Sequence, residues 1–214
     1  MLADHFPPYG LRLRTPRLEL RLPDLDELAE LADLAVAGIH PPDTMPFLTP
    51  WTLEPPADIA RSVLRKYWKA LSEWTPQEWV LKLAVFHEGT AIGVQEISAK
   101  EFAVRREVST GSWLGQRYQG KGFGVEMRAA VLDLGFTGLG AEEAVSFALA
   151  SNAASLAVSR KLGYTVDGTE RQVVQGRLAI DTRQRLTREA WRQHRTVDVE
   201  IEGLEPCRGL FGLA

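Results

Sequence analysis

The chain has 214 residues, of which 45% are hydrophobic and 25% charged, and a formal net charge of −3 at pH 7. This length and composition predict a single α/β domain with one core. No basic run points to nucleic acid, the lone Cys207 excludes an internal disulfide, and the four scattered histidines indicate no metal site. No signal-peptide pattern starts the chain, and no uncharged run reaches the roughly 20 apolar residues of a membrane span, so we expect a soluble, cytoplasmic protein.

The N-terminal third predicts one strand and two helices. Apolar and charged residues alternate over 11–23, which is typical of a half-buried strand. Asp24 and Glu27 have the spacing of a capping box and predict a helix that begins there. A second helix is expected over 59–71.

The middle of the chain predicts a long loop and three strands. The proline-rich segment 40–56 is long enough to expect a functional role, as a wall of a substrate site. Residues 79–98 predict a hairpin that turns at Glu88-Gly89-Thr90. A further strand is expected over 108–114.

The C-terminal half predicts alternating helices and strands. A helix follows residue 124, with one buried stripe. A short apolar strand over 144–150 precedes a helix capped by Ser151 or Asn152. Residues 178–195 predict a strand and then a helix capped by Thr187. The whole order predicts a mixed sheet with helices on its faces.

The segment 115–124, "GQRYQGKGFG", lies between the strand at 108–114 and the following helix. It approaches the ATPase loop G-x-x-x-x-G-K-[ST], but Gly122 stands where a hydroxyl must hold Mg²⁺. The dinucleotide pattern G-x-G-x-x-G also fails, because its third glycine position is Val125. The pattern Q-x-x-G-x-G is met by Gln119, Gly122 and Gly124. This pattern favours a pyrophosphate held without metal by backbone N–H groups at a helix N-terminus. A glycine-rich turn without a ligand is the alternative.

A second motif lies about 30 residues later in "VSFALASNAASLAVSRKLGY". It has Asn152 at the end of a strand, Ser155 three residues later, and the pair Gly163-Tyr164. With "TPRLELR", "GSWLGQRYQGKGFGVEM" and "RLTREAW", it resembles the GNAT family of acyl-CoA N-acyltransferases over residues 11–195. The resemblance is to the branch of the ribosomal-protein N-terminal acetyltransferases, and within it to an actinobacterial subgroup that includes a succinyl-CoA-binding member.

The resemblance implies the GNAT fold: a mixed, mostly antiparallel sheet of six to seven strands, helices on both faces, and a splayed central strand pair. The pantetheine arm of acetyl-CoA or succinyl-CoA would lie in the splay like an added strand. A backbone N–H there would polarise the thioester carbonyl. The residues implied to bind the cofactor are Trp113, Leu114, Gly115, Gln119, Gly120, Lys121, Gly122, Phe123, Gly124, Asn152 and Ser155. For three of them a plainer role is open: core packing for Trp113, an exposed lysine without a role for Lys121, and a helix cap for Asn152.

The resemblance further implies direct attack of an amine on the thioester, favoured by placing the two reactants together. Many members have a Tyr seven residues after the Asn as general acid, but this position holds Ser159. Ser155 is the candidate acid instead, unless it only bonds the backbone of the first helical turn.

The sequence offers two candidates for the general base. A Glu that related members carry is replaced by Ser109 or Thr110, which leaves Glu96 and Glu107 as candidates, either of which could face solvent. Phe47 and Trp51 are candidates for an acceptor pocket or for the core. Gln95, Ser98 and Lys100 are candidate partners of a succinyl carboxylate.

The sequence therefore predicts a cytoplasmic N-acyltransferase that moves an acetyl or succinyl group from coenzyme A to a small-molecule or peptide amine. The missing Tyr and Glu leave a non-catalytic acyl-CoA sensor as the alternative. The C-terminal extension 196–214 begins with an alternating segment over 196–204, which is expected to add a strand, either to a neighbouring subunit in a homo-oligomer or to its own sheet.

Overall fold

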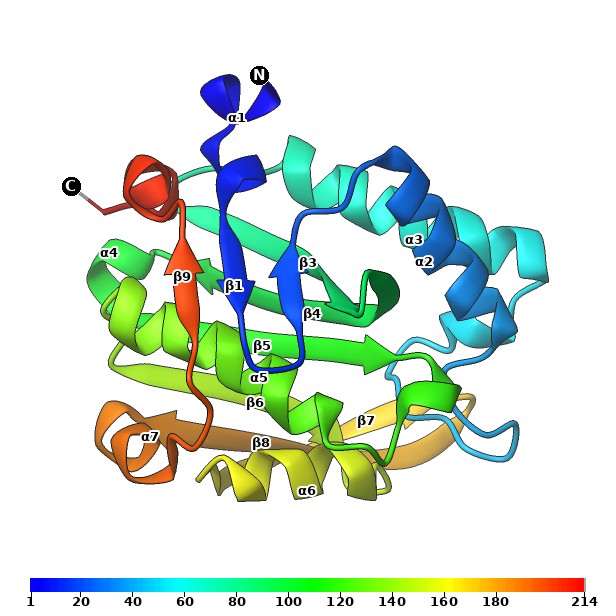
Figure 1. Ribbon diagram of the computed structural model, residues 1–214. Coiled ribbons are helices and arrows are strands. Elements are labelled where there is room, and N and C mark those ends of the chain that lie inside the picture. The colour runs from blue at the N-terminus through cyan, green and yellow to red at the C-terminus, as the bar shows by residue number, and fades with distance from the viewer. Residues whose placement is uncertain (214) are drawn as a thin grey trace.

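A nine-stranded sheet forms the centre of the computed structural model, which describes residues 1–213 (Figure 1). The strand order is β7-β8-β6-β5-β4-β3-β2-β1-β9, and every neighbouring pair is antiparallel except β5 and β6. The strands are β1 (Arg12–Arg14), β2 (Glu19–Arg21), β3 (Glu78–His87), β4 (Thr90–Lys100), β5 (Glu107–Leu114), β6 (Glu143–Leu149), β7 (Thr165–Val174), β8 (Arg177–Thr187) and β9 (Glu200–Glu202). The predicted mixed, mostly antiparallel sheet is confirmed.

Helices cover both faces of this sheet, as expected. The helices are α1 (Leu2–His5), α2 (Leu25–Ala37), α3 (Pro56–Ser72), α4 (Phe102–Arg105), α5 (Phe123–Asp133), α6 (Ala153–Lys161) and α7 (Arg188–His194). Alternate residues of β3 belong to two different buried clusters: Leu83 lies in the cluster under α5, and Ala84 in the cluster under α2 and α3. Because strand side chains alternate between faces, the two clusters lie on opposite sides of the sheet.

Local signals in the sequence explain several of the element ends. The capping box at Asp24 and Glu27 forms with both of its hydrogen bonds, and the β3–β4 turn falls at Glu88 and Gly89, both with positive φ. Asn152, rather than Ser151, caps α6, and Thr187 caps α7. These ends are set by contacts within a few residues, which explains why the sequence predicts them.

The sheet has more strands than the six to seven expected, for three reasons. The segment 11–23 is not one strand, because Thr15 bonds Leu18 through backbone and hydroxyl and turns the chain between β1 and β2. Strand β7 has no sequence signal of its own, because most of its residues are exposed and it pairs only with β8. The third reason is strand β9, which the C-terminal tail adds at the edge of the sheet beside β1.

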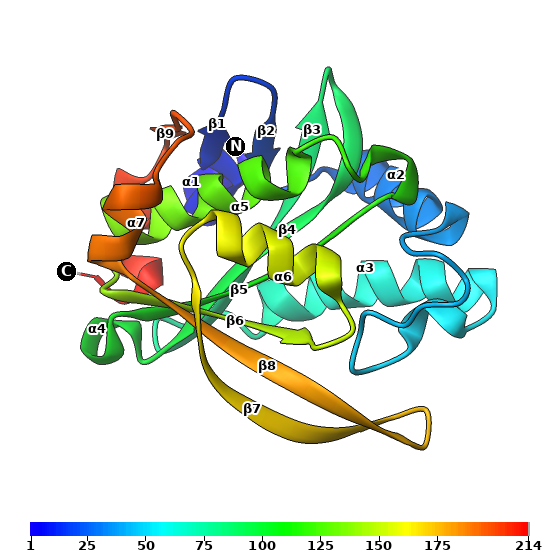
Figure 2. The same cartoon turned by 90° about the horizontal axis from the view of Figure 1, so that it is seen from below.

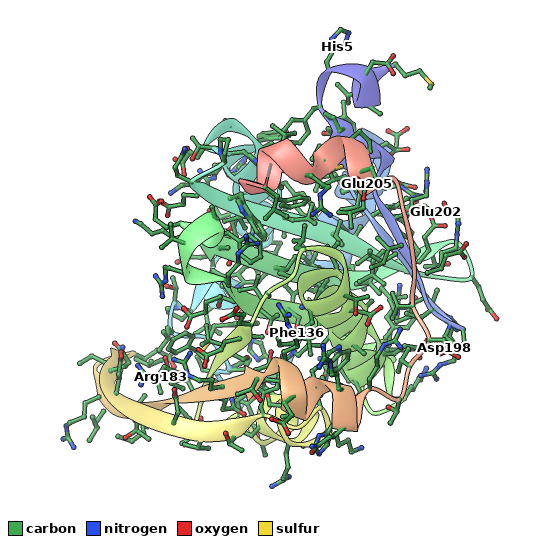
Figure 3. The ribbon with its side chains drawn as sticks, turned by 90° about the vertical axis from the view of Figure 1, so that its left-hand side faces the viewer. His5, Phe136, Arg183, Asp198, Glu202 and Glu205 are labelled. Atoms are coloured by element: carbon green, nitrogen blue, oxygen red, sulfur yellow. The ribbon has the colours of Figure 1, made fainter. Side chains whose placement is uncertain are left out.

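The C-terminal tail adds its strand to its own sheet. In β9, Ile201 lies opposite Leu13 of β1. Glu202, which is labelled in Figure 3, makes an ion pair with Arg14. Of the two outcomes expected for the tail, the structure therefore shows the intramolecular one. The homo-oligomer stays a prediction, now without support from the tail.

Candidate active site

The central parallel pair β5–β6 separates part-way along its length. The two strands are paired from Glu107 opposite Glu143 to Thr110 opposite Ser146, and no further. Strand β5 nevertheless continues to Leu114, with only β4 as a neighbour. One edge of the last four residues of β5 is therefore left without a strand partner, and this is the predicted splay.

The loop that follows β5 presents a row of unused backbone donors. Within residues 1–213, the amides of residues 120–124 donate no hydrogen bond. Gly120 and Gly122 have φ of +74° and +86°, a region that favours glycine, and no atom lies within 4 Å of where a Cβ of Gly120 would stand. These free amides lie at the N-terminus of the eleven-residue α5, an arrangement that fits a phosphate group. The site thus fits the pyrophosphate of coenzyme A.

Other residues of the loop hold it in place. The Gln119 amide donates to the Gln116 carbonyl, and its side chain donates to the carbonyls of Ile39 and Leu114 at 2.8 and 2.9 Å. Gln119 therefore positions the loop, and the free donors begin one residue later than expected. A Cβ on Gly115 would lie 2.5 Å from Leu34 of α2, which explains the glycine there by packing.

Arg17, in the turn between β1 and β2, contacts this loop and was missed by sequence reasoning. Its guanidinium pairs with Glu126 of α5 at 2.5 Å, donates to the Lys121 carbonyl at 3.1 Å and lies 4.7 Å from the ring centroid of Phe123. The Phe123 side chain is buried, so its free backbone amide is the group that it offers to a phosphate. The sole sequence signal for Arg17 is its place in "TPRLELR", the first of the family segments.

A cavity of about 380 Å³ lies beside the splayed strands. Its walls come from α3, β3, β4, β5, α5, β6, α6, β8 and the loop before α3. The lining residues are Pro46, Phe47, Leu48, Trp51, Val63, Lys66, Tyr67, Lys82, Val94, Glu96, Thr110, Gly111, Ser112, Trp113, Arg128, Ser146, Phe147, Ala148, Leu149, Asn152, Ser155 and Asp181.

One wall of the cavity is aromatic. Phe47 and Trp51 come from the proline-rich loop, with ring centroids 5.6 Å apart, and Trp51 lies 6.5 Å from Trp113 at the end of β5. The ammonium of Lys66 lies 3.9 Å from the Trp51 ring centroid. Such a wall suits an apolar or cationic group. The loop therefore lies where a substrate wall was expected, and both of its candidate residues reach the cavity.

The start of α6 carries the two polar candidates at the splay. Asn152 caps the helix by accepting from the Ser155 amide at 3.1 Å, and its amide nitrogen lies 3.5 Å from the Pro46 carbonyl. The Ser155 hydroxyl makes no hydrogen bond within residues 1–213. It is therefore free to donate to a group in the cavity.

Arg128 of α5 is the second residue that sequence reasoning missed. It is 4% exposed, donates to Ser159 Oγ at 2.8 Å and to Ser112 Oγ at 3.4 Å, and its Nε has no partner in the described chain. No carboxylate in residues 1–213 pairs with it, and burial lowers its pKa. A buried cation without a counter-ion is costly, which marks this wall as a place for an anionic group. Ser159, at the position of the family's Tyr, is fully buried under this arginine.

Two carboxylates line the cavity, in different states. Glu96 on β4 makes an ion pair with Lys82 across the strand pair. Asp181 on β8 is 4% exposed and makes no ion pair within the described residues, and burial together with the nearby Glu170 raises its pKa. Asp181 was not a candidate from the sequence.

The structure does not bring four expected residues to this cavity, namely Gln95, Ser98, Lys100 and Glu107. Gln95 directly precedes Glu96 on β4, so its side chain lies on the opposite face of the sheet. There it is fully buried and donates to the Gly111 carbonyl at 3.1 Å. Ser98 and Glu107 line a separate hollow of about 210 Å³, which also contains Lys100. Glu107 is six residues before Trp113 on β5, about 20 Å away for an extended strand, and it pairs with Arg105 and Arg185.

A family model described as an acetyltransferase (GNAT) domain matches residues 17–165. The chain belongs to the GNAT acetyltransferase family. This stretch contains the splayed strands, the loop at 115–124 and Asn152. Two residues described above fall at or beyond its limits: Arg17 is its first position, and Asp181 lies after its end.

Solved structures share this fold at low sequence identity. RimL, a ribosomal alpha-N-protein acetyltransferase solved in complex with coenzyme A, has a TM-score of 0.63 and 17% identity, over 82% of this chain and 96% of that one. A chimera of the spermidine N-acetyltransferase SpeG from Vibrio cholerae and hSSAT has a TM-score of 0.63 and 18% identity, over 82% and 98%. A GNAT-family acetyltransferase from Bacillus anthracis has a TM-score of 0.61 and 15% identity, over 83% and 99%.

Residues 1–213 contain neither a metal-binding cluster nor a membrane-spanning helix. They hold no group of three or more His, Cys, Asp or Glu side chains placed to bind a metal ion. None of their helices is both long and apolar enough to span a bilayer.

Proposed function

We propose that this protein transfers an acyl group from a coenzyme A thioester directly to an amine. The observation that carries the proposal is the unpaired edge of β5 from Gly111 to Leu114, which leads straight into the free amides of residues 120–124. The edge suits the two amides of a pantetheine arm, and the free amides suit the pyrophosphate. The cavity beside this edge has room for an acceptor amine next to the thioester, which favours direct attack.

Within this proposal, Ser155 donates a proton to the departing sulfur. Its hydroxyl has no other partner in the described chain, and it lies on the same cavity wall as Asn152, which holds the pantetheine amides. Free backbone N–H groups at the end of β5 would stabilise the oxyanion of the tetrahedral intermediate. Such stabilisation typically contributes several kcal/mol.

The acyl group is acetyl or succinyl, and Arg128 favours succinyl. The carboxylate of a succinyl chain would supply the counter-ion that this buried guanidinium lacks. An acetyl group would leave the charge unpaired. Arg128 replaces Gln95, Ser98 and Lys100 as the partner proposed for this carboxylate.

The test is to incubate the purified protein with acetyl-CoA or succinyl-CoA and a panel of primary amines, and to follow the release of free thiol. We expect amine-dependent release, with the acylated amine identified by mass spectrometry. Tight binding of coenzyme A without thiol release above background would favour the non-catalytic sensor and contradict the proposal.

A further inference from the structure

Asp181 is a buried carboxylate that the rest of the fold does not use. Glu96, Glu107 and Glu126 each pair with a cationic side chain. Asp181 has no such partner in residues 1–213, although only 4% of its surface is exposed. A charge left unpaired at this depth is costly unless a ligand compensates it.

Asp181 lies beside the end of β6 in the sheet. Its cross-strand partner is Leu149, the last residue of β6. Leu149 precedes Asn152 by three residues in the chain. From this point on, the β7–β8 hairpin has no third strand beside it and extends past the sheet (Figure 2). Asp181 therefore stands at the base of this arm and lines the cavity together with Asn152 and Ser155.

A second carboxylate reinforces the negative charge. Glu170 on β7 is the direct cross-strand partner of Asp181, so the two side chains lie on one face of the hairpin. Like charges placed directly opposite each other are destabilising. The nearby arginines do not relieve them: Arg183, labelled in Figure 3, bonds Asp167 at 2.7 Å, and Arg185 bonds Asp167, Glu107 and Glu143. Neither carboxylate has a cationic partner in residues 1–213, and Asp181 brings its negative charge to the cavity that Phe47 and Trp51 also line, which suits an ammonium group.

We propose that Asp181 binds the ammonium group of the acceptor and then takes its proton. This inference rests on the acyl transfer proposed above and names both the acceptor class, a protonated primary amine, and the general base. Burial and Glu170 raise the pKa of Asp181, which brings it closer to that of an amine and makes it a better base than an exposed aspartate.

The step balances as follows. The ammonium gives one proton to the Asp181 carboxylate, and the neutral nitrogen forms a C–N bond to the thioester carbonyl carbon, whose π electrons move to oxygen. When the intermediate collapses, the C–S bond breaks and the sulfur leaves with its electron pair. The second N–H proton reaches the sulfur through Ser155, and Asp181 releases its proton to solvent. The products are an amide, free coenzyme A thiol and one proton.

The other candidate carboxylates are less suited to this step. Glu96 is neutralised by Lys82, and Glu107 lies in the separate hollow with two arginines. The remaining charged groups that line the cavity are Lys66 of α3 and Arg128 of α5, and neither forms an ion pair with Asp181.

The experiment compares Asp181→Asn, Asp181→Glu and Glu170→Gln with the wild type, and uses Glu88→Gln in the exposed β3–β4 turn as the matched control. We expect Asp181→Asn to lower kcat/KM at neutral pH about 100-fold, the low end of general-base effects, while coenzyme A binding by calorimetry stays within about twofold. Asp181→Glu should restore part of the loss. Glu88→Gln should change neither value.

The pH profile tests the base itself. The kcat/KM of the wild type should fall as the pH drops through the pKa of Asp181, because the protonated carboxyl cannot accept a proton. Glu170→Gln removes a charge that raises this pKa, so the acid limb should move to lower pH. A purely structural role of Asp181 would not move this limb. An acid limb that is unchanged in Glu170→Gln and lost in Glu96→Gln would assign the base to Glu96 and overturn the inference.

A binding measurement separates this inference from the proposed function. Benzylamine is titrated into protein saturated with coenzyme A, where no acyl group can react. Wild-type binding that weakens at least about tenfold in Asp181→Asn supports the ammonium site, even if no acyl-CoA is turned over and the proposed transfer fails. Equal binding by wild type and Asp181→Asn, or none by either, overturns the inference.

Discussion

The phosphate-binding loop and the acceptor cavity are neighbours, but they are built from different parts of the chain. The loop uses consecutive backbone amides of residues 120–124. The cavity uses side chains that range from Pro46 to Asp181 and belong to three helices, five strands and the loop before α3. A backbone site depends on φ, ψ and glycine, whereas a side-chain cavity depends on how distant elements pack. The loop should therefore respond most to changes in conformation, and the cavity to changes in charge.

The largest effect is expected from Gly122→Val in the loop. Gly122 has φ of +86° and Arg17 lies 3.2 Å from where its Cβ would stand, so a valine would both strain the backbone and displace the free amides. We expect calorimetry to show coenzyme A binding weakened about 50-fold, a loss that corresponds to the upper range of such strain. Gly89→Val is the control, because Gly89 has a similar φ of +77° in a turn without a proposed role. Equal loss of affinity in both variants would show that Gly122 acts through stability alone.

Arg128→Met tests the charge in the cavity. If Arg128 holds a succinyl carboxylate, the variant should lose about 20-fold in kcat/KM for succinyl-CoA, within the range of one charge-assisted hydrogen bond. Transfer from acetyl-CoA should change little. The melting temperature should stay equal or rise, because a buried unpaired charge is removed.

Arg185→Met is the matched control for this substitution. Arg185 contacts Asp167, Glu107 and Glu143, so its loss should lower the melting temperature without changing the choice of acyl donor. If Arg128→Met lowers transfer from both donors equally, Arg128 does not select the acyl group.

Ser155→Ala should have a smaller effect on catalysis. A thiolate is a moderately good leaving group even without protonation, so we expect kcat to fall about tenfold, below the usual range for a general acid. The KM for acyl-CoA should be unchanged. Ser151→Ala, four residues earlier and outside the cavity, should keep full activity. A kcat of Ser155→Ala equal to the wild-type value would remove Ser155 from the mechanism.

The smallest effect is expected from Asn152→Ala, which separates a cap from a ligand contact. Asn152 and Thr187 cap α6 and α7 by the same kind of bond, so alanine at either position should cost about 1 kcal/mol of unfolding free energy. Only Asn152→Ala should also raise the KM for acyl-CoA, about threefold, the loss of a neutral hydrogen bond. An unchanged KM in both variants would leave Asn152 with the role of a cap alone.

The sequence by itself predicted the features that depend on neighbouring residues. These include the caps at Asp24 and Thr187, the β3–β4 turn and the glycine-rich loop between β5 and α5. It also predicted the splay and the family, because the family segments keep their order and spacing along the chain. For the caps, the turn and the loop, a short stretch of chain is enough to specify the local conformation.

Only the tertiary structure decided which side chains face the cavity. Glu96 and Glu107 were equivalent candidates in the sequence, but β4 places the first at the cavity and the pairing of β5 places the second in the hollow beyond it. In the sequence, Arg128 is one of several residues of a predicted amphipathic helix. Only the packing of α5 against β5 and α6 shows that its guanidinium is buried beside Ser112 and Ser159 without a counter-ion. Asp181 lay in a strand with no motif. The charge state and partners of a buried group depend on residues far away in the chain, and no local pattern records them.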